Sequence, residues 1–243
     1  MNNENLKKFY VVATPIGNLE DISLRALRIL KEVDLILCED TRVTKRLLNK
    51  YEIKTPVQSY SFDKVRVGRA QPFNPKVEKI ISFLKEGKNI ALVSDAGTPT
   101  ISDPGSFLIS KIKESFGDSP NGGVQIIPVP GANALIAAFS ASGVPSSEFL
   151  FLGFLPHKKG RETLFKEITN SKRAVAFYES PHRLLKTLEA LKDKIGERKI
   201  VVARELTKIY EDIRTGSAGQ MIKYFEENKD KLKGEFVIIV SRA

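Results

Sequence analysis

Short apolar runs alternate with amphipathic segments along the first half of this chain. Runs of strand length occupy Phe9–Ala13, Leu35–Cys38, Ile90–Val93 and Val124–Ile127. Between them lie segments with apolar residues at three- and four-residue spacing, such as the helix expected after a cap at Asp21 or Ser23. A basic helix is expected from Val43. Regular alternation of strands and helices predicts an α/β fold whose sheet is mostly parallel, with helices as crossovers.

The second half begins with a helix of small and apolar residues, expected from Gly131 to about Gly143. Strands are then expected at 149–154, 173–178, 199–203 and 235–240, alternating with charged helices. We therefore place a domain boundary near Pro130. The predicted domains are an N-terminal α/β domain, 1–130, and a C-terminal α/β domain, 131–243.

Three turns rich in small residues follow three of the predicted strands. They are Thr14–Asn18, Ser94–Pro99 and Pro128–Gly131. In a parallel sheet all three gather at the carboxyl edge, where open α/β sheets bind ligands. Ordinary strand-to-helix turns also use Gly, Pro and Asp, so a single turn of this kind is weak support. Three at one edge favour a ligand cleft.

Charge and composition narrow the class of partner. The 243 residues include 39 Lys and Arg against 29 Asp and Glu, a net charge of +10 spread over both halves. This surplus favours an anionic partner such as nucleic acid, although a lysine-rich background gives the same sum. With no signal-like start, no membrane-length apolar run and one cysteine, we expect a cytoplasmic protein without membrane association.

Several familiar kinds of site are missing from the sequence. It has no Gly-x-Gly-x-x-Gly after the first strand and no Walker-type phosphate loop. One cysteine and two distant histidines also make a metal site unexpected.

Three charged clusters follow predicted strands and are candidates for chemistry. In Cys38–Arg42, Glu39 or Asp40 would deprotonate a hydroxyl, or Asp40 or Thr41 would simply cap the next helix. In Tyr178–Arg183, His182 is a candidate base, and the alternative is a capped helix start with Ser180 as cap and Pro181 in the first turn. In Ala203–Lys208, Arg204 and Glu205 would either pair structurally or line a cleft.

Two basic segments are candidates for contact with phosphate. Residues 61–76 carry four basic residues, one acidic residue and two prolines without helical or strand periodicity, which predicts a long functional loop. Residues 157–173 carry six basic and two acidic residues. Such runs are usually solvated faces, but a net basic chain gives phosphate contact more weight.

Taken in order, these motifs resemble one family. The strings concerned are Ala13–Ile22, Cys38–Arg42, Ser94–Pro99, Ser102–Gly105, Val129–Leu135, Phe151–Pro156, Tyr178–Arg183 and Ala203–Lys208. They are similar to those of the ribosomal RNA small subunit methyltransferase I family, within the tetrapyrrole-methylase-like class, and they extend over nearly the whole chain. The chain departs from the family at Ser61–Arg66, where the family usually has a stretch rich in His and Glu.

The resemblance implies a two-domain α/β fold with a mixed sheet in the C-terminal domain and S-adenosylmethionine in the cleft between the domains. It also implies a homodimer that methylates a cytidine ribose 2′-hydroxyl in the decoding region of 16S rRNA. The donor contacts implied by analogy are Pro15, Asp95, Ala96, Gly97, Thr98, Pro99, Ser102, Phe139, Ser140, Ala141, Leu155, Tyr178, Glu179, Leu206 and Thr207.

The reaction also needs a proton acceptor and contacts to RNA. The residues we expect to act on the hydroxyl are Glu39, Asp40, Arg42, Glu179 and Glu205, with His182 as a further base. The residues we expect to bind RNA are Lys64, Arg66, Arg69, Lys158, Lys159, Arg161, Arg204 and Lys208. Alternatives from other classes are a tetrapyrrole C-methyltransferase, a diphthine synthase and a non-enzymatic ribosome-associated RNA-binding protein.

Overall fold

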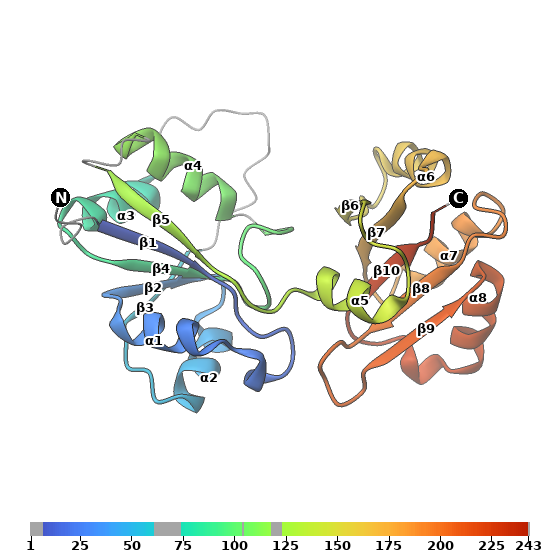
Figure 1. Cartoon of the computed structure of the whole chain (residues 1–243), viewed down its shortest axis with the longest axis horizontal. Coiled ribbons are helices and arrows are strands. Elements are labelled where there is room, and N and C mark those ends of the chain that lie inside the picture. Colours follow the sequence, from blue (N-terminus) through green and yellow to red (C-terminus); the bar gives the residue numbers. More distant parts are fainter. Residues whose placement is uncertain (1–6, 61–73, 104, 118–122, 243) are drawn as a thin grey trace. The chain divides into compact units, whose positions relative to one another are not determined.

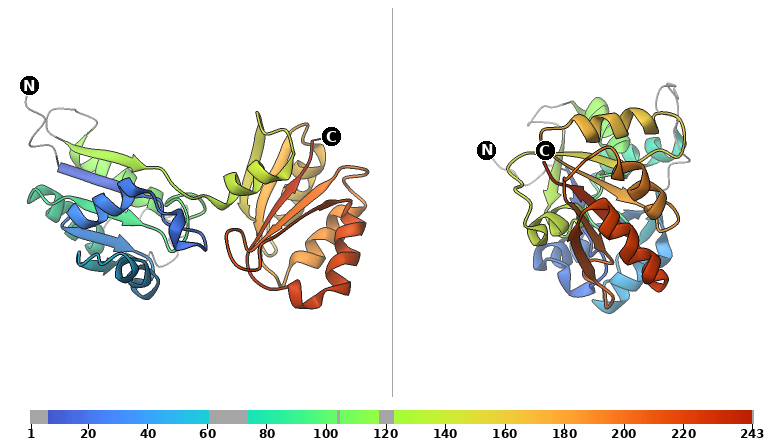
Figure 2. Two further views of the ribbon diagram at one scale, coloured as in Figure 1. Left: turned by 60° about the horizontal axis from the view of Figure 1, so that its bottom comes forward. Right: turned by 90° about the vertical axis from the view of Figure 1, so that its right-hand side faces the viewer.

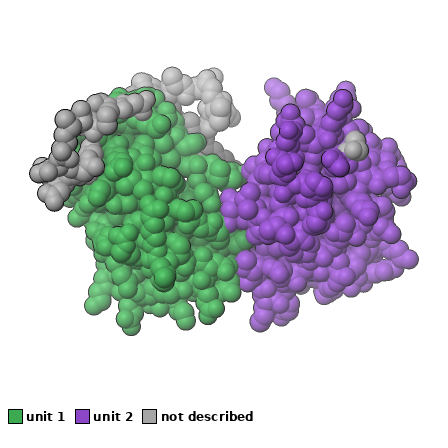
Figure 3. All heavy atoms as spheres, viewed as in Figure 1, with its two compact units in different colours: residues 1–132 green, residues 133–243 purple. Residues whose placement is uncertain are grey.

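The computed structural model describes residues 7–60, 74–103, 105–117 and 123–242. It divides into two compact units, Met1–Ala132 and Asn133–Ala243, which Figure 3 colours separately. The chain passes from unit 1 to unit 2 at Ala132, two residues after the boundary expected at Pro130.

Unit 1 is built on a five-stranded parallel sheet. Its strands are β1 (Lys7–Val12), β2 (Leu35–Cys38), β3 (Val57–Ser59), β4 (Ile90–Val93) and β5 (Val124–Val129), in the order β3-β2-β4-β1-β5. The parallel sheet expected from the sequence is confirmed. Strand β3 was not expected, because its three residues are too short and too exposed to produce an apolar run.

Helices cover both faces of this sheet (Figure 1). Helices α1 (Leu24–Glu32) and α2 (Thr41–Lys50) pack with residues such as Val12 and Ile36 on one face. Helices α3 (Pro75–Lys85) and α4 (Gly105–Phe116) pack with residues such as Phe9 and Leu37 on the other. All four residues of β2 and of β4 are buried, as expected for parallel strands covered on both sides.

The helix starts are set by capping side chains, and two predicted starts are corrected. Ser23 caps α1, as one of the two caps proposed. Asp40 caps α2, which begins at Thr41 rather than at Val43. Asn74 caps α3, so the C-terminal end of the predicted loop 61–76 is helical, with Pro75 in the first turn. Residues 61–73 lie outside the described residues.

Unit 2 contains a mixed five-stranded sheet, as expected. Its strands are β6 (Phe149–Phe154), β7 (Ala174–Glu179), β8 (Ile200–Arg204), β9 (Asp212–Gly216) and β10 (Phe236–Val240), in the order β6-β7-β10-β8-β9. Only β6 and β7 are parallel neighbours, and the other pairs are antiparallel. The edge strand β9 was not expected, since its sequence, Asp-Ile-Arg-Thr-Gly, has a single large apolar residue.

One face of the second sheet carries helices α6 (Arg161–Asn170), α7 (Leu184–Lys192) and α8 (Ala218–Glu227). Their side chains form one core with Phe177 and Ile238 of the sheet. Helix α5 (Ala134–Ser142) contacts β9 and β10, and Figure 2 shows it on the side of the sheet opposite α8. Short 3-10 helices at Leu19–Asp21 and Lys229–Lys231 complete the elements described.

Two predicted helix starts in unit 2 also need correction. Helix α5 begins at Ala134 rather than Gly131, because the side chain of Asn133 accepts from the N–H groups of Leu135 and Ile136 and caps it. Residues Ser180–Arg183 form a turn, in which the Arg183 N–H donates to the Ser180 carbonyl, and α7 starts after it at Leu184. Pro181 therefore lies in this turn instead of the first helical turn.

No helix among the described residues is long and apolar enough to cross a membrane. Within the same residues, the structure contains no group of three or more acidic, histidine or cysteine side chains able to hold a metal ion.

Candidate functional site

The three predicted turns of unit 1 lie together at the carboxyl edge of its sheet. The Thr14 N–H donates to the Gly97 carbonyl (2.9 Å), and the Gly97 N–H donates to the Thr14 carbonyl (3.1 Å). The Thr98 hydroxyl donates to the carbonyl of Ala132 (3.1 Å), and the Ala13 N–H donates to that of Val129 (3.1 Å). Hydrogen bonds thus join the segments that follow β1, β4 and β5 into one structure.

Gly97 is required at the centre of this structure for two reasons. Its φ of +83° lies in the left-handed region that side chains disfavour. A Cβ at this position would lie 3.2 Å from the Ile16 Cγ2 and 3.6 Å from the Ala132 carbonyl oxygen. The loop Ser94–Pro99 is therefore held close to both neighbouring turns, with Ala96 exposed at its tip.

Backbone strain is concentrated in or beside the segments predicted to bind the donor. Among the described residues, five other than glycine have a positive φ, and four of them are Thr100, Ser102, Glu205 and Thr207. Each such conformation costs about 1–3 kcal/mol and persists where surrounding structure holds it, often at functional sites. This clustering supports a role for both segments, one in each unit.

The neighbouring residues Asp40 and Arg42 bind each other. The Asp40 carboxylate caps α2 by accepting from the Arg42 N–H (2.8 Å), and it also accepts from the Arg42 guanidinium. These hydrogen bonds lower the pKa of Asp40 to about 2. A carboxylate so easily ionised is a weak proton acceptor, which makes capping the better account of Asp40.

Glu39 has the opposite environment. It follows β2, is half-buried, and its side chain is hydrogen-bonded to that of Asp103, which follows the loop after β4. Burial, this hydrogen bond and the nearby charges of Asp103 and Asp95 raise the pKa of Glu39 to about 7. Burial also raises the pKa of Asp103. A carboxyl group with a pKa near neutrality is suited to accept a proton.

Asp103 was not among the predicted site residues. Its position in the string Ser102–Gly105 was a signal for it. Only the fold, however, brings Asp103 next to Glu39, which is far from it in the sequence. Asp95, in the loop after β4, is also bound to the segment after β2, because its Oδ1 accepts from the Asp40 N–H (2.9 Å). The carboxyl groups of Glu39, Asp95 and Asp103 thus form one acidic cluster at the sheet edge.

In unit 2, three of the predicted donor segments lie at one edge of the sheet. Strands β6 and β7 are parallel, and β8 runs in the same direction because both β7 and β8 pair antiparallel with β10. Glu179 and Arg204 are register partners of the same residue, Phe236. The segments at Leu155, Tyr178–Glu179 and Leu206–Thr207 therefore follow strand ends at this edge.

The predicted contacts in α5 do not lie with these segments. The Phe139 ring packs against Phe149, 4.4 Å between centroids, at the amino end of β6. Ser140 and Ala141 are exposed in the following turn of α5. The N-terminal end of this helix is nearer the predicted site, because the backbone of Leu135 hydrogen-bonds the Tyr178 side chain. Periodicity alone gave no indication of which end of α5 faces that edge.

Glu179 is enclosed by internal partners. Its side chain is fully buried and forms ion pairs with Arg183 (2.6 Å) and Arg161 (3.8 Å). It also accepts hydrogen bonds from the Ser180 N–H (2.8 Å) and the Thr187 hydroxyl (2.6 Å). We therefore assign Glu179 a structural role and remove it from the candidate bases. His182, in the same turn, is exposed.

Glu205 is also held by partners. It accepts from the Lys208 ammonium (2.8 Å) and from the Glu235 N–H (2.9 Å). Although burial opposes ionisation, these hydrogen bonds lower its pKa. Glu205 is thus a weak candidate for proton transfer, and Lys208 is neutralised by Glu205 and Glu235.

The predicted RNA contacts divide into three groups. Lys64, Arg66 and Arg69 lie outside the described residues. Arg161 donates to the Thr187 hydroxyl and the Pro156 carbonyl, and Arg204 donates to the carbonyls of Lys233 and Tyr210, so both guanidinium groups have internal partners. Lys158 and Lys159 are exposed and stay available as predicted contacts.

Comparison with known proteins gives consistent results. The family described as Tetrapyrrole (Corrin/Porphyrin) Methylases matches residues 8–222. A protein of Thermotoga maritima is 44% identical over 234 residues, covering 96% of this chain and 98% of that protein. Proteins of Bacillus subtilis (45% identical, 95% of this chain and 74% of theirs) and Escherichia coli O157:H7 (44%, 96% and 77%) are similar too. All three are named Ribosomal RNA small subunit methyltransferase I.

Solved structures with the same fold are more distant in sequence. A cobalt precorrin-4 methyltransferase superposes with a TM-score of 0.67 at 19% identity, over 96% of this chain and 94% of that one. A diphthine synthase gives a TM-score of 0.70 at 12% identity, over 96% and 89%. At such identities the likeness concerns the fold alone.

Proposed function

The chain belongs to the tetrapyrrole (corrin/porphyrin) methylase family, and from this premise we propose that it is an S-adenosylmethionine-dependent methyltransferase acting on ribosomal RNA. The proposed product is a 2′-O-methylated cytidine in the decoding region of 16S rRNA within the small ribosomal subunit. The observation that carries this proposal is the 42–46% identity, over 95–96% of the chain, to eight proteins named for that RNA class.

The residues present at the edge of the first sheet fit such a donor. When bound, S-adenosylmethionine supplies a methyl group on a positively charged sulfonium. The loop Ser94–Pro99 offers small side chains, closely held backbone and the carboxyl group of Asp95. We therefore keep Pro15, Asp95–Pro99 and Ser102 as proposed donor contacts. Leu155, Tyr178, Leu206 and Thr207 stay predictions.

Transfer to a ribose hydroxyl is an in-line displacement at the methyl carbon. The 2′-oxygen forms the new bond to carbon while the carbon–sulfur bond breaks and its electron pair goes to sulfur. The hydroxyl is a poor nucleophile until its proton is shared with a base. We propose that Glu39 accepts this proton, because its pKa is raised, whereas the pKa values of Asp40 and Glu205 are lowered. Glu179 is enclosed by Arg183 and Arg161.

The first experiment tests the activity itself. Small subunits from a strain lacking this gene are incubated with the purified protein and methyl-labelled donor, and the labelled nucleotide is mapped. We expect one 2′-O-methylcytidine in 16S rRNA. Methylation of uroporphyrinogen without methylation of rRNA would refute the proposal in favour of a tetrapyrrole C-methyltransferase. Methylation of a protein substrate instead would favour the diphthine synthase alternative.

A second experiment tests the donor loop. In Gly97→Val, a branched side chain must occupy a left-handed backbone position already in contact with Ile16. We expect calorimetry to detect no donor binding by Gly97→Val, and none by Asp95→Ala, while the exposed variant Lys159→Ala binds as wild type does. Wild-type affinity in both loop variants would show that the donor binds elsewhere. Absence of binding by the wild type would favour the non-enzymatic alternative.

We also propose that the protein acts in the cytoplasm, because its proposed substrate is there.

We retain the homodimer that the family resemblance implies. Two large apolar side chains after β8, Ile209 and Tyr210, are 91% and 71% exposed, which supports a protein contact at this place. Sedimentation at micromolar concentration should give twice the chain mass of 27.1 kDa. A monomer under these conditions would remove the homodimer from the proposal.

A further inference from the structure

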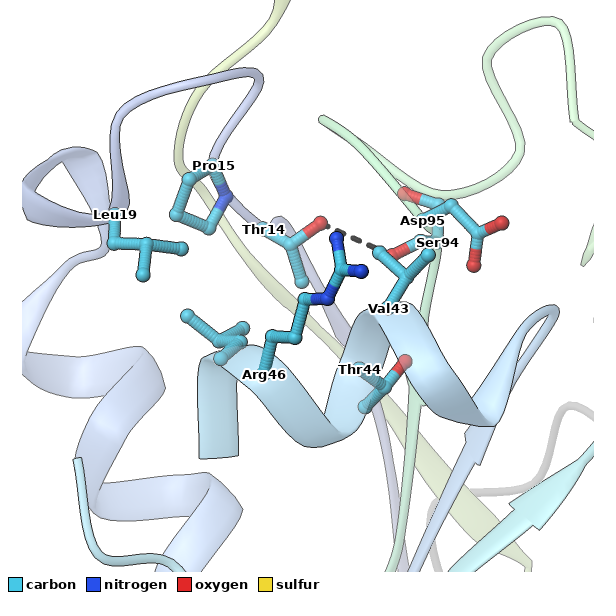
Figure 4. Close-up of a pocket in the computed structure, with 9 residues that line it drawn as sticks. Thr14, Pro15, Leu19, Val43, Thr44, Arg46, Ser94 and Asp95 are labelled. Atoms are coloured by element: carbon cyan, nitrogen blue, oxygen red, sulfur yellow. Dashed lines mark hydrogen bonds between the residues drawn. The ribbon is translucent and has the colours of Figure 1, made fainter. Parts of the chain in front are cut away.

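A cavity of about 120 Å³ lies in unit 1 between helix α2 and the turn after β1 (Figure 4). Most of its wall is apolar and comes from Pro15 and Leu19 on one side and from Val43 and Leu47 of α2 on the other. An apolar cavity of roughly 150 Å³ accommodates benzene, so this slightly smaller, open space has room for one ring at most and is far too small for a tetrapyrrole. Val43 is 37% exposed, which leaves the cavity open to solvent.

Some polar groups of the wall have hydrogen-bond partners, and one does not have any among the described residues. The Thr14 hydroxyl donates to the Ser94 carbonyl (3.1 Å), drawn as a dashed line in Figure 4, and Asp95 is bound at its Oδ1 to the Asp40 N–H. Arg46 has neither a hydrogen bond nor an ion pair with any residue that the structure describes. Its guanidinium extends from α2 among the other lining residues in Figure 4. A guanidinium without a partner among residues 7–60, 74–103, 105–117 and 123–242, beside a small apolar space, suits a ligand that is flat and polar at its edges.

Helix α2 also carries uncompensated positive charge on its exposed side. Lys45, Arg46 and Lys50 are exposed, and none forms an ion pair within the described part of the chain. The helix contains no acidic residue between Thr41 and Lys50. Such a surface attracts a phosphate backbone. The RNA contacts expected from the sequence lie elsewhere, and two of them, Arg161 and Arg204, have internal partners.

We propose that this cavity receives the pyrimidine base of the nucleotide to be methylated, with Arg46 against the base and Lys45 and Lys50 beside the flanking phosphates. The inference rests on the proposed function. Enzymes that act on single-stranded RNA hold bases unstacked from their neighbours, on apolar side chains and guanidinium planes. Pro15 and Asp95 line the cavity and are also proposed donor contacts, so the cavity adjoins the proposed donor site.

Substitutions at Arg46 distinguish contact with the base from general charge. Stacking of a base on one side chain is worth about 1–3 kcal/mol, or about 5- to 150-fold. We expect Arg46→Leu to lower kcat/KM for small subunits at least about tenfold, and Arg46→Lys to restore little because it lacks the planar group. Lys50→Leu, which removes the same charge one turn away, should cost about two- to threefold. Donor affinity by calorimetry should be unchanged in all three.

Filling the cavity is an independent test. Val43→Phe places a ring in the opening, whereas the matched control Asn49→Phe places the same ring on an exposed position of α2 outside the cavity. We expect Val43→Phe to lose RNA methylation while keeping wild-type Tm and donor affinity, and Asn49→Phe to keep all three. If Val43→Phe lowers the Tm, the Arg46→Leu variant and cross-linking of the wild-type complex decide whether the base binds in this cavity.

Photochemical cross-linking gives a readout that does not depend on turnover. Irradiation of the wild-type complex with 16S rRNA, followed by mass spectrometry, should join the target cytidine to a peptide containing residues 43–50. Cross-links of that cytidine only to other segments would overturn the cavity assignment, as would wild-type kcat/KM in both Arg46→Leu and Val43→Phe. The proposed function fails separately, if the wild-type enzyme does not methylate 16S rRNA at all.

Discussion

Glu39 and Asp40 carry carboxyl groups one residue apart, and their surroundings shift the two pKa values in opposite directions. Asp40 caps α2 and binds Arg42, which lowers its pKa to about 2. Glu39 is half-buried beside Asp103 and Asp95, which raises its pKa to about 7. The pair therefore separates into a helix cap and a proposed proton acceptor, and the difference is testable.

The pH profile tests the role of Glu39. If its carboxylate accepts the proton, kcat/KM must rise as pH increases through about 7, since only the ionised form is competent. We expect Glu39→Gln to lose at least about a hundredfold in activity, the usual scale for a general base, and to lose this pH dependence. Donor affinity, measured by calorimetry, serves as the control. A variant with wild-type activity and profile would remove Glu39 from the mechanism.

Glu39→Gln should lower activity but raise stability at high pH. The pKa of Glu39 in the folded protein is raised from 4.5 to about 7. The contribution of Glu39 to the free energy of unfolding is therefore fully present below pH 4.5 and is lost as pH rises through 7. Above that pH an ionised Glu39 faces Asp103 and Asp95. Glu39→Gln stays neutral, so its free energy of unfolding at pH 8 should exceed that of the wild type, and the two should converge near pH 4. Urea titrations at both pH values measure this, and equal stability at pH 8 would contradict the assigned environment.

At the scale of elements, the start of α2 links the fold to the site. Its cap, Asp40, donates its own N–H to Asp95, so the position of the helix and the position of the proposed donor loop are connected by one hydrogen bond. The first turn of α2 also supplies Val43 to the cavity wall. A change that destabilises the start of α2 should therefore affect both the proposed donor loop and the cavity.

Substitutions of Asp40 separate capping from catalysis. Asparagine also caps helices well, whereas alanine does not. We expect Asp40→Asn to keep kcat/KM within about twofold of wild type and Asp40→Ala to lower both the Tm and the activity. Thermal denaturation and the methylation assay provide the two readouts. Equal loss of activity in both variants, with the Tm of Asp40→Asn unchanged, would restore the carboxylate to a catalytic role.

For the whole molecule, the net charge of +10 should govern binding of RNA. Each phosphate neutralised in a single strand contributes about −0.7 to the slope of log affinity against log salt concentration. We expect binding of 16S rRNA to weaken steadily with salt, with a slope made shallower by roughly 0.7 in Lys50→Leu. Donor binding should vary little. A salt-independent affinity for RNA would contradict electrostatic docking, and an unchanged slope in Lys50→Leu would remove that residue from the proposed surface.

The local pattern of the sequence was sufficient for most elements of the fold. Buried parallel strands such as β2 and β4 are continuous apolar runs, and their predicted bounds agree with the structure. The short or polar strands β3 and β9 were missed, because pairing with a neighbour rather than their own composition makes them strands. Helix starts shifted by two or three residues where a side chain, such as Asn133, caps the backbone.

The sequence by itself determined the family, the parallel sheet and the gathering of three turns at its carboxyl edge, because these follow from short-range patterns and the geometry of parallel strands. Only the tertiary structure decided what each charged group does. Arg161 and Arg204 have the same residue type as Arg46, yet internal partners surround the first two and Arg46 is left at an open cavity. The pKa of Glu39 likewise depends on Asp103, which lies beside it only after folding. Burial and partner distance are properties of the folded chain, and they set the charge and reach of every side chain at the site.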